Sequence, residues 1–266
     1  MQRLNNILPL KGLCLTAGVI LGLTLLPSNA LAQQIVLTEW NFNSVPPDST
    51  STPATGTTIP NIGSGTASLV GGTTATFAAG GNGSTSPNNS SDPATSDDSG
   101  WNTAGYPGQG SSDKTAGVRF KVSTLGYQDI TVKWDQRFSN TASRNAQFQY
   151  SIDGINFVDS GLLSVPNSSG DDWFNGNLRN LSSIPEVNNN ANFAFQIVSA
   201  FEPSTSSYFS ADAGTSQAYA GGTWRFDMVQ VNATPVPEPF TIIGSLTAIG
   251  IGTVIKRKYV SAGQVK

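Results

Sequence analysis

The sequence predicts an all-β protein whose central part is an antiparallel β-sandwich of the jelly-roll type. Three observations support this prediction. Several short central segments alternate apolar and polar residues, none of the central part shows a sustained helical period, and 28 Gly and 15 Pro among 266 residues supply many turns. Helices are expected only at the two ends, as a signal peptide and as a single carboxyl-terminal transmembrane span.

The first predicted strand covers Ile35 to Phe42. After it, residues 44–114 consist largely of Ser, Thr, Gly, Asn and Pro. Such a composition cannot bury much apolar surface, so this stretch predicts long loops. Two short strands are expected within it, at 67–70 and 74–78.

From residue 114 onward the alternation becomes regular. Strands are predicted at residues 118–122, 130–134, 147–152, 155–159, 193–197 and 224–231. Asp153 and Gly154 suit a two-residue type I′ hairpin turn between two of these strands. In the last strand the successive apolar residues Met228 and Val229 predict a bulge. The first and last strands are expected to lie close together, and three tryptophans within strands are predicted core residues: Trp40, Trp134 and Trp224.

Residues 1–32 have the order of a secretory signal peptide. Arg3 and Lys11 make the start basic, an apolar run follows at 12–26, and the small residues Ala30 and Ala32 mark the cleavage site. Signal peptidase is therefore an expected partner, and Gln33 is the expected first residue of the mature chain. An uncleaved membrane anchor is the alternative.

The tail, residues 234–266, has three parts. It begins with a proline-rich motif of four residues: Val236, Pro237, Glu238 and Pro239. A run of 16 uncharged residues follows at 240–255, and then a basic cluster of three: Lys256, Arg257 and Lys258. Sixteen helical residues reach about 24 Å, which is short for a hydrocarbon core of about 30 Å. The basic cluster predicts a cytoplasmic end, with the central part, 33–233, outside the cytoplasm.

This three-part tail resembles the PEP-CTERM sorting signal, in the form VPEPFTIIGS that is similar to the cyanobacterial version. The resemblance implies recognition by an exosortase, cleavage near Pro237–Pro239, and a bacterial host that makes exopolysaccharide. A plain membrane anchor behind a proline-rich linker is the alternative. The second half of the central part, at residues 121–158 and 221–231, also resembles a β-sandwich module of exported bacterial proteins, which implies fold and export but no activity.

Charge and composition exclude several classes of function. Between Gln33 and Pro239 lie all 17 acidic residues and only eight basic ones, so this part carries a net charge of −9 and is not expected to bind nucleic acid. With no His and one Cys, at position 14 in the predicted signal peptide, the chain has no Ser-His-Asp triad, no Cys-His pair and no Cys-rich or His-ligated zinc site.

The sequence therefore predicts a non-enzymatic protein that is exported, held in the inner membrane by its tail, and released to the cell surface or extracellular matrix. A carbohydrate-binding module for exopolysaccharide is the alternative, and an extracellular hydrolase is a second one. Neighbouring acids occur at 97–98 and 171–172, but adjacent residues on a strand point to opposite faces, so neither doublet forms a pair of catalytic carboxylates by itself.

Two sets of side chains are candidate ligand sites. Aromatic residues in the polar loops could stack on sugar rings; the candidates are Trp101, Tyr106 and Trp173, with Tyr208 and Tyr219. No cofactor is expected, and calcium is the one metal that the composition permits, because it prefers carboxylate and carbonyl oxygens. A structural calcium ion where the terminal strands meet would use Glu39 and Asp227.

Overall fold

A computed structural model describes residues 33–47, 55–81, 88–93, 98–215 and 217–237 of the chain. These ranges contain eleven strands and two short 3₁₀ turns, at Pro185–Val187 and Ala213–Thr215. Within them, no helix is long and apolar enough to span a membrane. The predicted signal peptide, the predicted span at 240–255, the basic cluster and the last two residues of the proline-rich motif lie outside the described residues.

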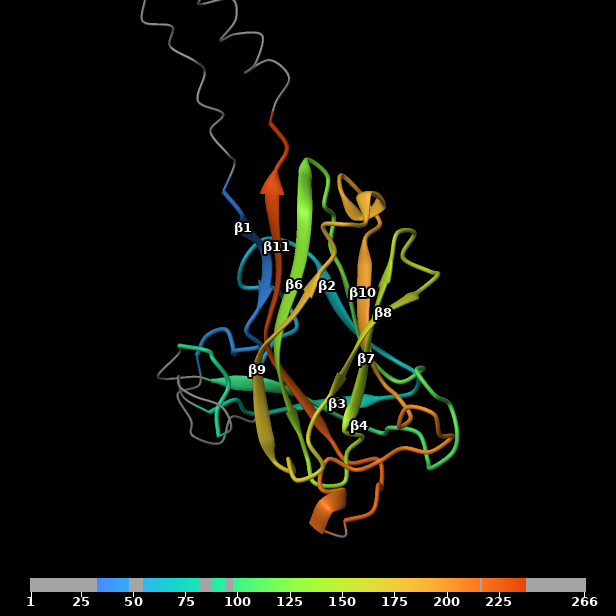
Figure 1. The fold of residues 1–266 in the computed structure, drawn as a ribbon. Coiled ribbons are helices and arrows are strands. Elements are labelled where there is room, and N and C mark those ends of the chain that lie inside the picture. The colour runs from blue at the N-terminus through green and yellow to red at the C-terminus, as the bar shows by residue number, and fades with distance from the viewer. Residues whose placement is uncertain (1–32, 48–54, 82–87, 94–97, 216, 238–266) are drawn as a thin grey trace, which may run out of the picture. The chain divides into compact units, whose positions relative to one another are not determined.

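The strands form two antiparallel sheets (Figure 1). The first sheet contains β1 (Ile35–Trp40), β3 (Thr74–Ala79), β4 (Ser99–Ala104), β6 (Tyr127–Phe138), β9 (Asp172–Asn180) and β11 (Trp224–Pro235). Its order is β3–β4–β11–β6–β9, with β1 also paired to β11. The second sheet contains β2 (Thr66–Val70), β5 (Gly117–Lys121), β7 (Asn145–Ser151), β8 (Val158–Ser164) and β10 (Ala194–Ser199), in the order β2–β5–β10–β7–β8. Apart from the pairs β3–β4 and β7–β8, consecutive strands of the chain lie in different sheets.

Aromatic rings from both sheets meet between them. The ring centroid of Trp40 lies 4.9 Å from that of Phe120, and the centroid of Trp134 lies 5.6 Å from that of Phe148. Each such pair adds about 0.5 to 1.5 kcal/mol beyond the burial of its surface. Trp40, Trp134 and Trp224 are fully buried, so the prediction of these three core residues is confirmed. The prediction of an all-β antiparallel sandwich is confirmed as well.

The polar stretch at 44–114 is more ordered than its composition predicts. It contains β4 in addition to the two expected strands, and β4 pairs with β3 on one side and β11 on the other. The segment at 172–180 was also not predicted, and it forms β9 beside β6. Both segments carry Gly and Asn, which are poor strand formers, so pairing with neighbouring strands overrides local propensity.

The β7–β8 hairpin exists, but the prediction of a two-residue turn is wrong. Six residues, 152–157, connect the two strands. Asp153 Oδ1 accepts hydrogen bonds from the backbone N–H groups of Ile155 (2.8 Å) and Asn156 (2.7 Å), and Gly154 has a φ of +75°. These hydrogen bonds hold a wider loop, and they lower the pKa of the Asp153 carboxyl well below its usual range.

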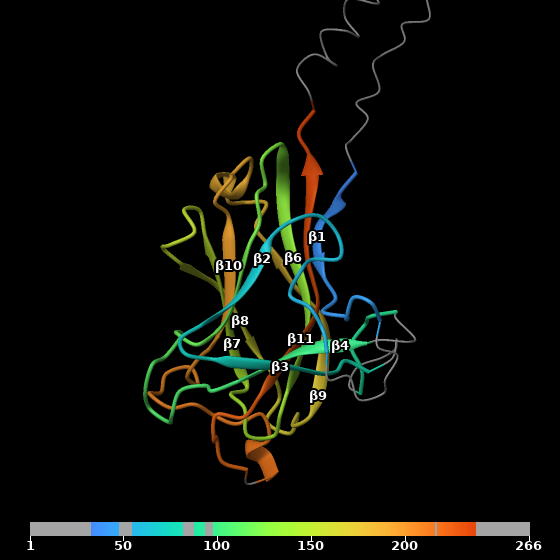
Figure 2. The ribbon, with the colours of Figure 1, turned by 180° about the vertical axis from the view of Figure 1, so that it is seen from behind.

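The predicted bulge in the last strand is confirmed. Met228 has a φ of +45°, and the register of β11 against β6 shifts between Asp227 and Gln230. At this bulge the partner on the other side of β11 changes from β4, which pairs with 224–226, to β1, which pairs with 229–233. Figure 2 shows β1, β4 and β11 meeting in this region.

The described ends of the body lie next to each other. Ile35 at the start of β1 pairs with Ala233 near the end of β11, so the expected neighbourhood of the first and last strands is confirmed (Figure 1). Strand β11 continues to Pro235, two residues past the boundary that the sequence predicts for the body, and the N–H of Val236 still donates to the carbonyl of Gly126.

Candidate functional site

The tryptophans predicted to stack on sugar rings are buried. Trp101 on β4 is 4% exposed and Trp173 on β9 is 1% exposed. The ring of Trp101 stacks on Phe42, with 5.5 Å between centroids. In this structure neither ring presents a face to a ligand, which corrects the prediction. Trp101 belongs to the core, and Trp173 is covered outside it, with its ring next to Gly100 of β4. The polar residues around both in the sequence do not indicate this burial.

The three predicted tyrosines fasten loops to the body. The ring of Tyr106 is half-buried, and its hydroxyl lies 2.7 Å from Thr103 Oγ1. Burial of this hydroxyl raises the pKa of Tyr106 well above its usual range. Tyr208 donates to the carbonyl of Ser112, and the ring of Tyr219 stacks on Tyr208 with 4.6 Å between centroids. Among the described residues every Trp and Tyr is buried or half-buried.

The doublet at 171–172 is likewise structural. Asp171 Oδ1 accepts a hydrogen bond of 2.7 Å from Arg137 Nη2 in an ion pair on the first sheet. Asp172 begins β9 and pairs with Phe138 of β6. In the other doublet, Asp97 lies outside the described residues and Asp98 is buried.

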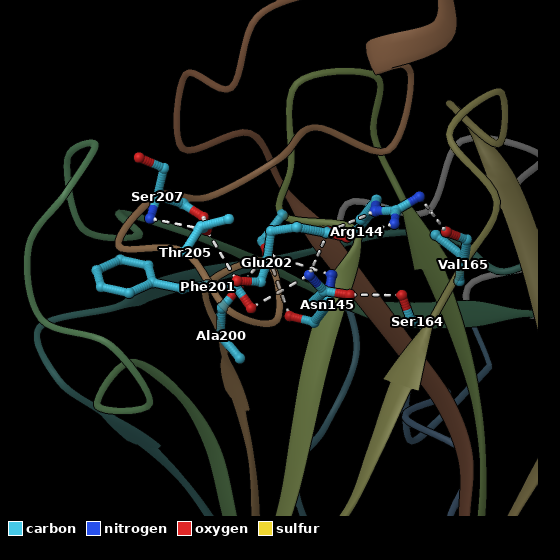
Figure 3. Close-up of polar contacts among 10 residues, drawn as sticks. Arg144, Asn145, Ser164, Val165, Ala200, Phe201, Glu202, Thr205 and Ser207 are labelled. Carbon is cyan, nitrogen blue, oxygen red and sulfur yellow. Dashed lines mark hydrogen bonds and ion pairs between the residues drawn. The ribbon is translucent and has the colours of Figure 1, made fainter.

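A polar network holds one loop region against the second sheet (Figure 3). Arg144 donates from Nε to Glu202 Oε2 (2.8 Å) and from Nη2 to Glu202 Oε1 (2.7 Å). The buried Asn145 donates from Nδ2 to the same Oε2 atom and to the carbonyl of Phe201, and its Oδ1 accepts from Ser164. These hydrogen bonds and the Arg144–Glu202 ion pair fasten the loop at 200–207 to the second sheet.

The predicted pairing of Glu39 with Asp227 does not occur. Glu39 accepts hydrogen bonds from Asn61 Nδ2 (2.6 Å) and Gln230 Nε2 (2.5 Å), so its carboxylate serves the pairing of β1 with β11. Asp227 instead lies beside Asp92 and Asp98, whose carboxylate oxygens come within 4.8 Å of its own. The bulge separates Asp227 from Gln230, and Glu39 lies opposite Gln230.

The second sheet carries a row of polar side chains on the face that is turned away from the core. Strand pairing places five residues in register, one from each strand: Ser68 of β2, Arg119 of β5, Gln196 of β10, Gln149 of β7 and Asp159 of β8. We call these five residues the polar row. Their neighbours in sequence on the central strands, such as Phe120 and Phe195, lie in the core, so alternation along the strands turns the row outward.

Hydrogen bonds connect the polar row from strand to strand. Arg119 donates from Nε (3.0 Å) and Nη2 (2.8 Å) to Gln196 Oε1. Gln196 Nε2 donates to Gln149 Oε1, and Gln149 Nε2 donates to Asp159 Oδ1 (2.7 Å). The far oxygen of Asp159 pairs with Lys114 Nζ at 2.6 Å. The side chains are thus held in one orientation before any ligand arrives.

The surroundings of the polar row are open at one end. On the same face the next position along the strands brings together Thr66, Lys121, Ala194 and Ser151, of which three are small. A pocket of about 280 Å³ continues from there, lined among others by Thr66, Lys121 and Asp153. The guanidinium carbon of Arg119 also lies 4.3 Å from the centroid of the Phe157 ring.

This arrangement can hydrogen-bond a neutral, hydroxyl-rich ligand. Carboxamides donate and accept, a guanidinium donates, and a carboxylate accepts. The sequence analysis did not identify the row, although Arg119 and Gln196 stand between core residues in predicted strands. Alternation along a strand predicts which side chains point outward, but it does not predict the register that aligns five strands.

No protein-family model and no curated protein matches the chain. Several solved structures are similar to it, among them two from one protein. One is the N-terminal CBM22-1–CBM22-2 tandem domain of Xyn10C from Paenibacillus barcinonensis, at 11% identity and a TM-score of 0.40; the match covers 79% of this chain and 49% of that chain, about half of its length. The other is the CBM22-1 xylan-binding domain of the same protein, at 9% identity and a TM-score of 0.33, covering 64% of this chain and 87% of that chain. Neither comparison places a ligand on this chain.

Proposed function

We propose that the chain is an exported, non-enzymatic protein of the cell surface or extracellular matrix, and that its polar row binds neutral polysaccharide. The polar row is the observation that carries the binding part of this proposal. Its five members span four strand-to-strand spacings, about 19 Å at roughly 4.8 Å each. That length suits an extended polymer better than a single small ligand.

Charge favours a neutral polymer over an acidic one. Arg119 and Asp159 balance each other within the row, and Lys114 is engaged by Asp159. The body around the row carries a net charge of −9, so an acidic polysaccharide meets long-range repulsion. Hydroxyl groups of a neutral chain can instead hydrogen-bond the exposed Ser68 and Asp159 and the half-buried guanidinium of Arg119, which Gln196 and Gln149, 6% and 8% exposed, hold in place.

The binding part is tested by affinity electrophoresis of the protein in gels that contain neutral polysaccharide. We expect retardation of the wild type and at least a tenfold loss of affinity in Gln149→Ala and Gln196→Ala, since each breaks the hydrogen-bond chain that holds Arg119 and Asp159 in place, and a tenfold loss corresponds to about 1.4 kcal/mol. Gln217→Ala is the matched control, because Gln217 is exposed in a loop away from the row. Equal retardation of all four proteins contradicts binding at the polar row.

The export part rests on the two end segments and is supported by the composition of the body. A body without thiols forms no disulfide in an oxidising compartment, which is compatible with export. The lack of His, the commonest general base, supports the non-enzymatic part of the proposal. The described body ends at Pro237 next to its own start, so the tail follows from that end of the sandwich. Exosortase processing would separate the body from the predicted span.

Processing is tested by changing the glutamate of the proline-rich motif. In Glu238→Ala we expect uncleaved precursor in the membrane fraction, whereas the control Glu186→Ala, at an exposed acid of the body, is processed like the wild type. The measurement is immunoblotting of membrane and released fractions. Unchanged release of the Glu238→Ala protein contradicts sorting through this motif while leaving binding at the polar row untouched.

A further inference from the structure

Three buried aspartates meet at the bulge of β11. Asp227 lies on the strand itself, and Asp92 and Asp98 lie on the connection between β3 and β4. One carboxylate oxygen from each comes within 4.8 Å of the other two. Asp227 is fully buried, Asp92 is 2% exposed and Asp98 is 8% exposed. Water therefore has little access to screen the three charges from one another.

The carboxylate of Asp227 has one buried oxygen without a hydrogen-bond donor. Its Oδ1 accepts the backbone N–H of Met228 at 2.7 Å and its carboxylate also interacts with the Ser90 hydroxyl, but its buried Oδ2 has no donor in hydrogen-bonding geometry among the described residues. A buried carboxylate oxygen without a partner is costly, so natural proteins normally supply a donor or a cation. Gly80 allows the carboxylates to come together, because a Cβ atom there would collide with Asp98 Oδ1 and lie 2.8 Å from Asp227 Oδ2.

Other polar groups surround the cluster, and Asn43 Nδ2 donates a hydrogen bond of 2.8 Å to Asp92 Oδ2. Asp135 is also fully buried and lies opposite Asp227 in the β6–β11 pairing, and its own oxygens accept N–H groups from Ser91 (2.6 Å) and Gly176 (2.7 Å). The nearby cation is Arg225, which donates to the carbonyl of Ala79. Burial first, and then the like charge of Arg137, lower the pKa of Arg225 to about 10, whereas the negative charges of Asp171, Asp98 and Asp227 oppose this shift.

We propose that Asp92, Asp98 and Asp227 bind a calcium ion that fastens the β3–β4 connection to the bulge of β11. Three carboxylates without nitrogen or sulfur ligands suit a hard cation. Calcium suits the site better than magnesium because its coordination geometry is less strict and because it sheds water more readily. The site differs from the one that the sequence predicts, since Glu39 takes no part in it.

A shared proton is the competing way to relieve the same repulsion. Burial, and then the negative charges of Asp98 and Asp92, raise the pKa of Asp227 well above its usual range. Without a metal ion, Asp227 would therefore hold a proton under conditions where exposed aspartates are ionised. A calcium site predicts that added calcium stabilises the protein, whereas a shared proton predicts no response to calcium, so experiment separates the two.

The test uses the full chain in mild detergent, stripped of divalent ions with a chelator, and measures the melting temperature with and without calcium. At a calcium concentration of about 100 times Kd, we expect the melting temperature to rise by about 5 to 10 °C. Asp227→Asn and Asp98→Asn should lose this rise, and in chelator they should melt no lower than the wild type, because each leaves fewer acids to repel one another in the cluster. The control Asp171→Asn, at an exposed acid, should keep the rise.

Equilibrium dialysis with calcium alone gives a readout that does not depend on stability. We expect one ion per chain in the wild type and in Asp171→Asn, and at least a tenfold weaker uptake in Asp98→Asn. A wild type whose melting temperature and uptake do not respond to calcium overturns the proposal and leaves the shared proton. An equal rise in the wild type and in Asp227→Asn overturns it as well, and a larger rise with magnesium than with calcium overturns the choice of ion.

Discussion

Replacing Asn145 by alanine tests how strongly the network in Figure 3 holds the loop at 200–207. The buried side chain of Asn145 makes three hydrogen bonds: to the carbonyl of Phe201, to Glu202 and from Ser164. A hydrogen bond contributes about 0.5 to 1.5 kcal/mol, and more where one partner is charged. Ser164 is exposed and can bond to water instead, so the expected loss in the free energy of unfolding is about 2 to 3 kcal/mol.

The assay is thermal unfolding followed by circular dichroism. For a domain of this size, each kcal/mol corresponds to about 2 to 4 °C, so Asn145→Ala should lower the melting temperature by roughly 4 to 12 °C. Asn192→Ala is the matched control, because the side chain of Asn192 is exposed, and it should stay within about 0.5 kcal/mol of the wild type. If Asn145→Ala is no less stable than this control, the network does not stabilise the loop.

Three further predictions concern charge and the buried aromatic residues. The pKa of Asp227 is raised in the folded state. Its proton therefore stabilises the fold fully below the ordinary aspartate pKa, and this stabilisation is lost as the pH rises through the raised value. The free energy of unfolding in chelator should show this fall with pH, and Asp227→Asn should not show it. Arg144, followed by Asn145, lowers the pKa of Glu202 despite partial burial, so the stabilisation is present above the unfolded pKa and is lost as the pH falls through the lowered value; Glu202→Gln should flatten this acid loss in denaturant titrations. Trp101→Phe should cost about 1 to 2 kcal/mol of stability and leave retardation by polysaccharide unchanged; weaker retardation at full stability would restore Trp101 as a sugar-stacking residue.

Alternation predicts the half-buried strands of this fold well and the polar strands poorly. Strands β5, β6 and β10 place Val118, Trp134 and Phe195 on their inner face. In each strand polar residues alternate with such apolar residues, and this alternation is what the sequence shows. Strands β4 and β9 contain few apolar residues, and they exist because neighbouring strands supply their hydrogen bonds. Local composition carries no information about such neighbours.

The polar row shows the same limit at the level of the site. Gln196 lies 77 residues from Arg119 and 47 residues from Gln149, and the three meet because β10 lies between β5 and β7. Strand order therefore decides the row, and strand order is a property of the whole chain. The predicted role of Asp227 as a calcium ligand depends in the same way on the bulge, which turns it toward Asp98 and away from Glu39.

The binding of neutral polysaccharide by the polar row is tested most directly by observing its side-chain amides in solution. In an NMR titration with neutral polysaccharide, the NH₂ signals of Gln149 and Gln196 should shift together and saturate, while those of Gln217 in its exposed loop should not move. Shifts confined to other parts of the body, or no shift at polysaccharide concentrations that retard the protein in gels, would contradict binding at this face.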